Sequence, residues 1–264
     1  MMPTLEEFLS LPYTDIAKIA PVSLGYAPAG TRRAAALQGI DPRSVQYLEH
    51  GRSSSFHVFD LLFKHGVQNI FCPILTSSDL KQIDQYVAGV IDLAFTLISD
   101  HDALAYYRNH GWRVRLLHHD RHTDMSKVAQ VLENYTAHGQ KTLYWTISKS
   151  PTDLADKNAV RAILQENIDP ISLYIGFGKP TINAEIVPPS LIGNMQCYWT
   201  QTPGYSMTEQ GFRSILYDYA YTRQTSHYPK ADRAMEFASY QQAWENLPTL
   251  GIGIQVGKCW IPAR

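Results

Sequence analysis

The sequence predicts an α/β fold with a mostly parallel central sheet of about six strands flanked by helices. Short apolar runs alternate with longer stretches in which apolar residues recur at helical spacing. Strands separated by helices imply right-handed crossovers, and therefore parallel pairing with helices on both faces of the sheet. Hydrophobic residues make up 45% of the 264 residues, enough for a sizeable core. No Pro/Gly/Ser-rich linker interrupts the chain, so we expect a single domain over 1–264, with 225–264 as a less regular C-terminal segment that wraps the sheet.

The first half of the chain supplies three strands and the helices between them. Glycines that follow helical stretches mark helix ends, and Ser/Asp clusters mark helix starts. In chain order we expect a strand at Val22–Ala27, a helix at Arg43–His65 that ends at Gly66, a strand at Val67–Leu75, a helix from Ser77-Ser78-Asp79 to Leu97, a short helix at Leu104–His110 stopped by Gly111, and a strand at Trp112–Leu117.

The second half continues the alternation and ends in one more long helix. We expect a helix at Val128–Ala137 stopped by Gly139, a strand at Thr142–Ser148, a helix at Ala155–Glu166, and strands at Ile171–Ile175 and Gln196–Thr200. The last helix opens at Ser206, because Ser206 and Glu209 have the Ser-x-x-Glu spacing of a capping box.

Charge and apolar runs exclude several classes of function. The net charge is −1 and no basic tract is present, which argues against a nucleic-acid partner. The N-terminus lacks the basic and apolar regions of a secretory signal. The longest apolar stretch, Val87–Ile98, is interrupted and too short to span a bilayer, so no stable membrane insertion is expected. An odd, widely spaced set of cysteines indicates buried, reduced thiols and a cytoplasmic protein: Cys72, Cys197 and Cys259.

The candidate site lies at the end of the first strand. The run from Leu24 to Arg33 leads from that strand through Gly30 and Thr31 into two adjacent arginines. A helix that begins here directs free backbone N–H groups and its positive dipole end toward the strand's carboxyl end, where phosphates bind. Arg32 and Arg33 add fork-shaped donors that match phosphate oxygens. The simpler alternative is a surface turn with two solvated arginines.

Two further segments carry weaker signals. Gly176-Phe177-Gly178-Lys179-Pro180 also follows a strand, but it completes neither a dinucleotide fingerprint nor a P-loop. The run from His118 to Asp124 suggests a metal site. Adjacent histidines on a strand point to opposite faces, however, and the spacing of known zinc motifs is missing. We therefore expect loop histidines near the pocket and no metal site there.

The order of motifs resembles the cis-prenyltransferases, the family with the undecaprenyl diphosphate synthase fold. The family's Asp-Gly-Asn-x-Arg-Trp motif matches Ala29–Ala34, and a family glycine on the next helix matches Gly51. Further matches follow at Phe63–Val67, Cys197–Thr200 and Leu216–Tyr219, so the resemblance covers roughly Val22 to Tyr228.

The departures from the family pattern are chemically coherent. Ala29 replaces the metal-binding aspartate, and Gln196 replaces a second carboxylate. Gly176–Pro180 replaces the Arg-Thr-Gly-Gly-Glu segment that helps hold isopentenyl diphosphate. The resemblance therefore implies a site that holds and ionises one diphosphate but elongates no chain. No protein metal ligand and no tightly bound cofactor are expected, although Mg²⁺ can accompany the diphosphate as its counter-ion.

Within this fold the chain is similar to a diverged branch, the tuberculosinyl adenosine transferase (tuberculosinol synthase) subfamily. The shared runs are Gly30–Arg33, Asp41-Pro42 followed by Tyr47, His65-Gly66, Ile175–Gly178 and Tyr205–Glu209. This similarity implies a diterpene synthase that ionises a bicyclic allylic diterpenyl diphosphate of the kolavenyl type. Water then captures the cation, giving a tertiary allylic alcohol of the kolavelool type.

The resemblance also implies roles for individual residues and a homodimer. Gly30, Thr31, Arg32 and Arg33 bind the diphosphate, and the two arginines and Tyr47 are catalytic. Two alternatives remain open: a terpenyl transferase that alkylates a small nucleophile such as adenosine, and a catalytically inactive subunit of a prenyltransferase complex. Tyr47 has the alternative role of a packed core tyrosine.

Overall fold

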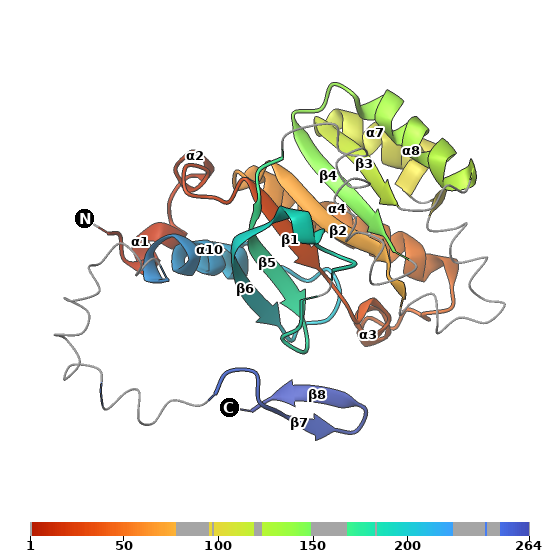
Figure 1. The fold of residues 1–264 in the computed structure, drawn as a ribbon. Coiled ribbons are helices and arrows are strands. Elements are labelled where there is room, and N and C mark those ends of the chain that lie inside the picture. The colour runs from red at the N-terminus through yellow and green to blue at the C-terminus, as the bar shows by residue number, and fades with distance from the viewer. Residues whose placement is uncertain are drawn as a thin grey trace.

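A computed structural model of the chain describes residues 2–77, 95, 96, 98–118, 123–148, 168–182, 184–223, 241 and 249–263 (Figure 1). Its centre is a parallel sheet of six strands in the order β3-β4-β2-β1-β5-β6. The strands are β1 (Ser23–Ala27), β2 (Asn69–Leu75), β3 (Trp112–His118), β4 (Lys141–Ile147), β5 (Ile171–Phe177) and β6 (Ile192–Thr200). The predicted fold class is therefore confirmed, and each expected strand is present.

The helices follow the predicted alternation with shifted ends. They are α1 (Leu5–Leu9), α2 (Tyr13–Ile16), α3 (Thr31–Leu37), α4 (Val45–Lys64), α7 (His101–Asn109), α8 (Thr123–Thr136) and α10 (Glu209–Tyr217), with the π-helix η3 (Asp218–Thr222) and the 3₁₀ turn η2 (Pro189–Leu191). The expected helix at Ala155–Glu166 lies outside the described residues, as does most of the helix expected from Ser77 to Leu97.

The predicted capping box of the last helix is wrong. The N-cap residue is Thr208, whose hydroxyl accepts a hydrogen bond from the backbone N–H of Gly211 at 3.1 Å. Ser206 donates instead to the carbonyl oxygen of Pro203 at 2.6 Å. Two hydroxyl residues stand before the apolar stretch, and the nearer one caps it. The helix therefore begins two residues later than its Ser-x-x-Glu spacing indicated.

Two regions contain regular structure that the sequence did not predict. Helices α1 and α2 precede the first strand, and a capping box formed by Thr4 and Glu7 starts α1. Within the C-terminal segment, β7 (Gly253–Val256) and β8 (Cys259–Pro262) pair as an antiparallel hairpin, separate from the sheet. Both regions are too short to show a reliable apolar period.

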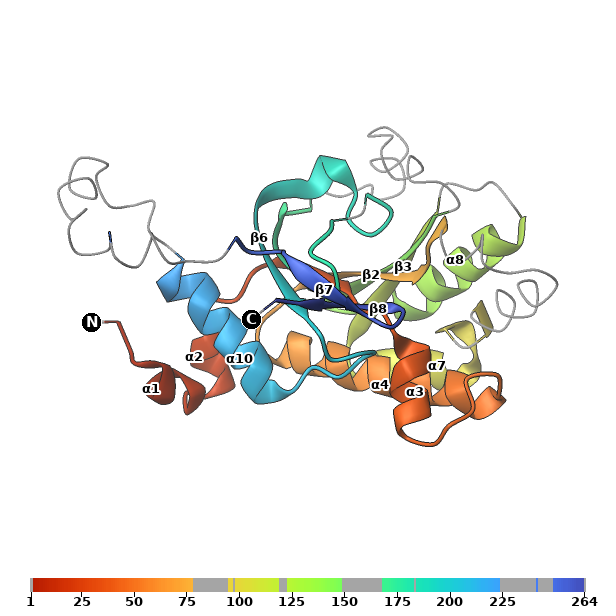
Figure 2. The same ribbon diagram turned by 90° about the horizontal axis from the view of Figure 1, so that it is seen from below.

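Helices α4 and α10 pack along one face of the sheet (Figure 2). Apolar side chains of α4 meet the strands there: Phe56, Val58, Phe59, Leu62 and Phe63. The other face carries a second apolar cluster, in which Val187 packs near Tyr174 and Phe71. Within the described part of the chain no helix is long and apolar enough to cross a membrane.

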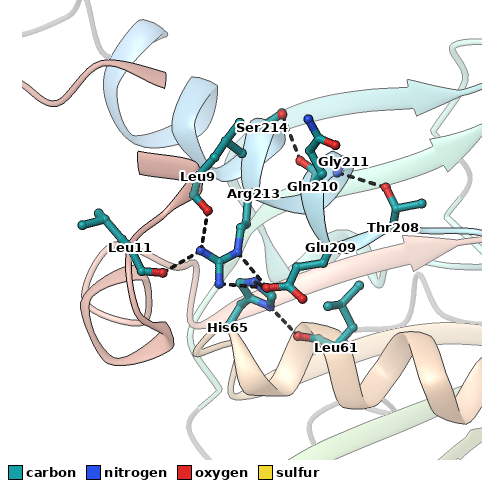
Figure 3. Close-up of polar contacts among 10 residues, drawn as sticks. All are labelled: Leu9, Leu11, Leu61, His65, Thr208, Glu209, Gln210, Gly211, Arg213 and Ser214. Carbon is teal, nitrogen blue, oxygen red and sulfur yellow. Dashed lines mark hydrogen bonds and ion pairs between the residues drawn. The ribbon is translucent and has the colours of Figure 1, made fainter. Parts of the chain in front are cut away.

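A cluster of polar side chains at the amino end of α10 joins α10 and α4 to the N-terminal segment that contains α1 and α2 (Figure 3). Arg213 donates to the carbonyl oxygens of Leu9 (3.0 Å) and Leu11 (2.6 Å) and pairs with Glu209 at 2.8 Å. The ring of His65, at the end of α4, is fully buried and bonds through Nδ1 to the carbonyl oxygen of Leu61 at 2.8 Å. The cluster thus fastens the N-terminal segment to α4 and α10.

The strand order places a switch point at β1. The chain passes from β1 to β2 on one side of the sheet, whereas β5 pairs with β1 on the other side. Loops that leave the carboxyl ends of two such strands diverge and leave a crevice between them, where ligands bind in open α/β sheets. Helix α3 starts at this position.

Candidate active site

Gly30 sets the start of α3. Its φ of +71° lies in the left-handed region, where glycine is favoured. A Cβ at this position would lie 3.0 Å from Nη2 of Arg33 and 3.1 Å from Cβ of Pro203. The first helical bond runs from the N–H of Ala34 to the carbonyl oxygen of Gly30 at 3.0 Å. The N–H groups that precede Ala34 therefore lack an intrahelical partner and are available to an anion.

Thr31 and Tyr47 form the hydroxyl pair of the site. Thr31 Oγ1 and Tyr47 Oη lie 2.7 Å apart and are partly buried. Ser44 caps α4 by accepting from the backbone N–H of Tyr47, which fixes the first turn that carries the tyrosine. Because only one of the two hydroxyls donates within the pair, the other keeps a proton that it can donate to a ligand. The structure thus brings together two predicted site residues from different helices.

The two arginines are both exposed but have different surroundings. The guanidinium of Arg33 lies 5.0 Å from the ring centre of Phe177, and its Nη1 donates to Sγ of Cys259 in the C-terminal hairpin at 3.5 Å. Arg32 has no hydrogen bond or ion pair with the described residues. No described carboxylate pairs with either arginine, so both charges are available to an anionic ligand.

The ends of three strands meet at this edge of the sheet. The N–H of Gly204 donates to the carbonyl oxygen of Ala29 at 2.8 Å, and the N–H of Gly178 donates to the carbonyl oxygen of Thr200 at 2.9 Å. The segment Gly176–Pro180, which carries one of the weaker signals in the sequence, is therefore a neighbour of Arg33 through Phe177. The two signals belong to one edge.

Two adjoining cavities open beside the hydroxyl pair. The larger has a volume of about 160 Å³ and is lined by Thr31, Tyr47, Leu48, Gly51, Arg52, Ser55, Phe56, Ile74, Ile98, Trp145 and Tyr205. The smaller has a volume of about 30 Å³ and contacts more polar residues, among them Gln38, His50 and Ser54. Both cavities share Thr31, Tyr47, Gly51 and Tyr205. Arg32 and Arg33 line neither of these two cavities.

Tyr205 forms the wall between the cavities and the core. Its ring centre lies 6.0 Å from that of Phe59 and 6.1 Å from that of Tyr26, and its hydroxyl lies 3.8 Å from Sγ of Cys72. Burial raises the pKa of Tyr205, Tyr26 and Cys72 well above their ordinary values, so these groups stay neutral. Sequence reasoning missed Tyr205 and Trp145 as cavity residues, although Tyr205 stands in a run that carries the family resemblance.

The cysteines differ in exposure. Cys72 is buried, Cys197 is partly buried and Cys259 is exposed. The expectation of three buried thiols is therefore wrong for Cys259, which lies on a hairpin outside the main sheet. All three are free thiols.

Within the described part of the chain, Ala29 and Gln196 supply no carboxylate for a protein-bound Mg²⁺. Ala29 is exposed and supplies only a methyl group. In the sheet register, Gln196 of β6 lies beside Leu173 of β5, and Leu173 lies beside Leu24 of β1. Gln196 therefore lies at the level of Leu24 along the strands, five residues before Ala29. Its Nε2 faces the carbonyl oxygen of Tyr219 at 3.4 Å. The two positions at which family carboxylates are replaced therefore do not come together in one chain.

Other metal ligands are also missing from the described residues, which contain no group of three or more His, Cys, Asp or Glu side chains able to hold an ion. The side chains of the run His118–Asp124, which suggested a metal site, lie outside the described residues.

Comparison with solved structures identifies the fold. The structure resembles lavandulyl diphosphate synthase from Lavandula x intermedia, solved with dimethylallyl diphosphate, with a TM-score of 0.60 and 9% identity over 77% of this chain and 97% of that one. It also resembles a probable undecaprenyl diphosphate synthase from Campylobacter jejuni, with a TM-score of 0.56 and 13% identity over 78% and 97%. The chain has the cis-prenyltransferase fold.

The sequence comparisons place it within that fold, although no family model matches. It is 35% identical to (+)-kolavelool synthase of Herpetosiphon aurantiacus over 98% of this chain and 96% of the relative. It is 27% identical to tuberculosinyl adenosine transferase of Mycobacterium tuberculosis over 86% and 85%. The chain belongs to the family of (+)-kolavelool synthase and is a terpene-handling enzyme of the cis-prenyltransferase superfamily.

Proposed function

We propose that this protein is a diterpene synthase that ionises a bicyclic allylic diterpenyl diphosphate and captures the cation with water. The observation that carries the proposal is the place of the Thr31–Tyr47 pair. It stands between the start of α3, whose two arginines pair with no described carboxylate, and a cavity lined mainly by apolar and aromatic side chains. The similarity to (+)-kolavelool synthase supports a kolavenyl-type substrate and a kolavelool-type product.

The first step is heterolysis of the allylic C–O bond. The diphosphate leaves with the electron pair, and negative charge develops on its oxygens. The N–H groups of Gly30 and Thr31 and the guanidinium groups of Arg32 and Arg33 stabilise this charge. The hydroxyl of the Thr31–Tyr47 pair that does not donate within the pair donates a hydrogen bond to the departing oxygen. No step requires a protein-bound metal; Mg²⁺ can accompany the diphosphate as a counter-ion.

The second step is capture of the allylic cation. The aromatic faces of Trp145, Tyr205 and Phe56 favour positive charge and keep bulk water away. One water, oriented by Tyr47, attacks the tertiary carbon, forms the new C–O bond and releases a proton to the diphosphate or solvent. The products are a tertiary allylic alcohol and diphosphate. By analogy with the family, we propose that the active form is a homodimer.

The test is turnover in ¹⁸O-labelled water. Purified protein is incubated with bicyclic C20 diphosphates such as kolavenyl diphosphate, with and without adenosine, and products are analysed by mass spectrometry. Ionisation followed by capture gives a tertiary alcohol that carries ¹⁸O on carbon. Simple phosphate-ester hydrolysis breaks a P–O bond and gives an unlabelled primary alcohol, which would contradict the proposal.

The same experiment separates the alternatives. A nucleoside adduct that forms only with adenosine identifies a terpenyl transferase, the activity named for the Mycobacterium tuberculosis relative. Absence of turnover with all bicyclic substrates favours an inactive subunit of a larger complex. For substitutions of Arg32 and Arg33, Arg43→Gln is a suitable control variant. Arg43 is an exposed arginine between α3 and α4 that lines neither cavity.

A further inference from the structure

Gly51 is a glycine in the interior of a long helix that the backbone does not require. Helix α4 runs from Val45 to Lys64, and Gly51 has no left-handed φ. Glycine in a helix interior costs stability relative to alanine. A Cβ placed on Gly51 would meet no described atom within 4 Å. Neither conformation nor packing against the described residues therefore accounts for a glycine at this position.

Other glycines of the chain show what a packing requirement looks like. At Gly66, which has a φ of +104°, a Cβ would lie 2.5 Å from Cα of Ala17. At Gly139 a Cβ would lie 2.2 Å from the backbone nitrogen of Arg113. At both positions the neighbouring backbone excludes a side chain, whereas at Gly51 the described residues leave the space open.

The open space at Gly51 lies in the cavity. Residues four apart share one face of a helix, so Gly51 lies between Tyr47 and Ser55 on the face that lines the larger cavity. Gly51 also lines the smaller cavity. It therefore borders the passage between the Thr31–Tyr47 pair and the apolar wall formed by Phe56 and Trp145.

We propose that Gly51 is a specificity-determining residue, whose missing side chain leaves room for the allylic end of a bulky terpenyl chain. The inference rests on the proposed function. The diphosphate lies at Thr31 and Tyr47, the hydrocarbon occupies the larger cavity, and the carbons next to the leaving oxygen cross the space above Gly51. A side chain at position 51 reduces the space through which the hydrocarbon passes, but it leaves the diphosphate site at Thr31 and Tyr47 accessible.

The test compares Gly51→Ala and Gly51→Leu with Ser53→Leu, which adds the same bulk on the exposed side of α4. For Gly51→Ala we expect a melting temperature raised by about 2 °C, because alanine favours the helix, together with a kcat/KM for the C20 diphosphate lowered at least tenfold. Gly51→Leu lowers kcat/KM at least a hundredfold. Calorimetric binding of inorganic diphosphate stays within twofold for both variants, and Ser53→Leu behaves as the unaltered protein.

Three results would overturn the inference. They are full activity in Gly51→Leu, a lower melting temperature in Gly51→Ala, and an equal loss of inorganic diphosphate binding. Failure of the proposed function is detected separately, with a C20 thiolodiphosphate that binds without reacting. If the unaltered protein binds this probe but forms no product from the C20 diphosphate itself, the synthase proposal is wrong. In that case the Gly51 inference is supported if Gly51→Leu no longer binds the C20 thiolodiphosphate. It is contradicted if Gly51→Leu binds this probe as tightly as the unaltered protein does.

Discussion

The two ends of the sheet use arginine in opposite ways. At the amino end, the side chain of Arg213 is only 8% exposed, and two backbone carbonyls and Glu209 satisfy its guanidinium. At the carboxyl end, Arg32 and Arg33 are exposed, and no described carboxylate pairs with them. The guanidinium of Arg33 lies over the ring of Phe177 and donates to the thiol of Cys259.

This difference separates a structural charge from an available one. A buried guanidinium must be satisfied within the protein, since an unpaired buried charge costs several kcal/mol. An exposed guanidinium stays hydrated until an anion replaces its water. We therefore expect substitutions at the amino end to change the free energy of unfolding and substitutions at the carboxyl end to change turnover.

The largest expected effect is on turnover in the double variant Arg32→Ala/Arg33→Ala. Loss of both cations removes charge stabilisation from the leaving diphosphate and should lower kcat/KM by about 10²–10³. The melting temperature should stay within about 2 °C, because exposed substitutions seldom change stability by more than ~0.5 kcal/mol. The control is Arg43→Ala. Equal turnover losses in the control and the double variant would contradict a specific role for the pair.

A large effect on stability is expected for Arg213→Ala. The carbonyl oxygens of Leu9 and Leu11 lose their donor, and Glu209 loses its partner. We expect the free energy of unfolding to fall by about 2–4 kcal/mol. Because the side chain of Glu209 is 44% exposed, water recovers part of the carboxylate's loss. Chemical denaturation measures this change, and kcat of the folded fraction should be unaltered. A stable variant with reduced kcat would reverse the assignment.

The local elements of this picture could be predicted from the sequence, and the long-range ones could not. The strand before Gly30 and the helix that carries Tyr47 follow from apolar periodicity and helix-start signals. The stacking of Arg33 on Phe177 joins residues far apart in the sequence, so no local pattern reveals it. The sequence places Trp145 in a strand, but which cavity it lines depends on how α4 packs on the sheet.

Motif matching identified residues without fixing their register. Gln196 matches a carboxylate position of the family, yet strand pairing sets it level with Leu24 and away from Ala29. At Ser206 the local spacing pointed to a cap that Thr208 forms instead. The error at Ser206 has a physical cause: several residues satisfy a short motif, and tertiary packing selects among them.

A smaller effect is expected for Tyr47→Phe. The change removes the hydroxyl that pairs with Thr31 but keeps the aromatic ring at the cavity. We expect kcat to fall about tenfold, in the range of one hydrogen bond made to a charged leaving group. The matched control is Tyr135→Phe, an exposed tyrosine of α8. A double-mutant cycle with Thr31→Val measures the coupling energy between the two hydroxyls. If the activation free energies derived from kcat change additively, the two hydroxyls act independently.

The smallest effect is a pH dependence of stability at the amino end. Burial, the largest cause, lowers the pKa of His65 below its ordinary 6.5, and the nearby Arg213 lowers it further; the bond to Leu61 and the charge of Glu209 oppose this shift. The unfolded chain therefore binds a proton at this histidine at a higher pH than the folded protein. The contribution of neutral His65 to stability is full above pH 6.5 and is lost as pH falls below 6.5 toward the lower folded value. The change in the free energy of unfolding with pH that His65 contributes cannot exceed about 1.4 kcal/mol per pH unit.

Urea denaturation between pH 5 and 8 should show a shallower pH dependence of the free energy of unfolding in His65→Gln. The control His57→Gln, at an exposed position of α4, should match the unaltered protein. An unchanged pH dependence in His65→Gln would mean that titratable groups other than His65 cause the pH dependence of stability.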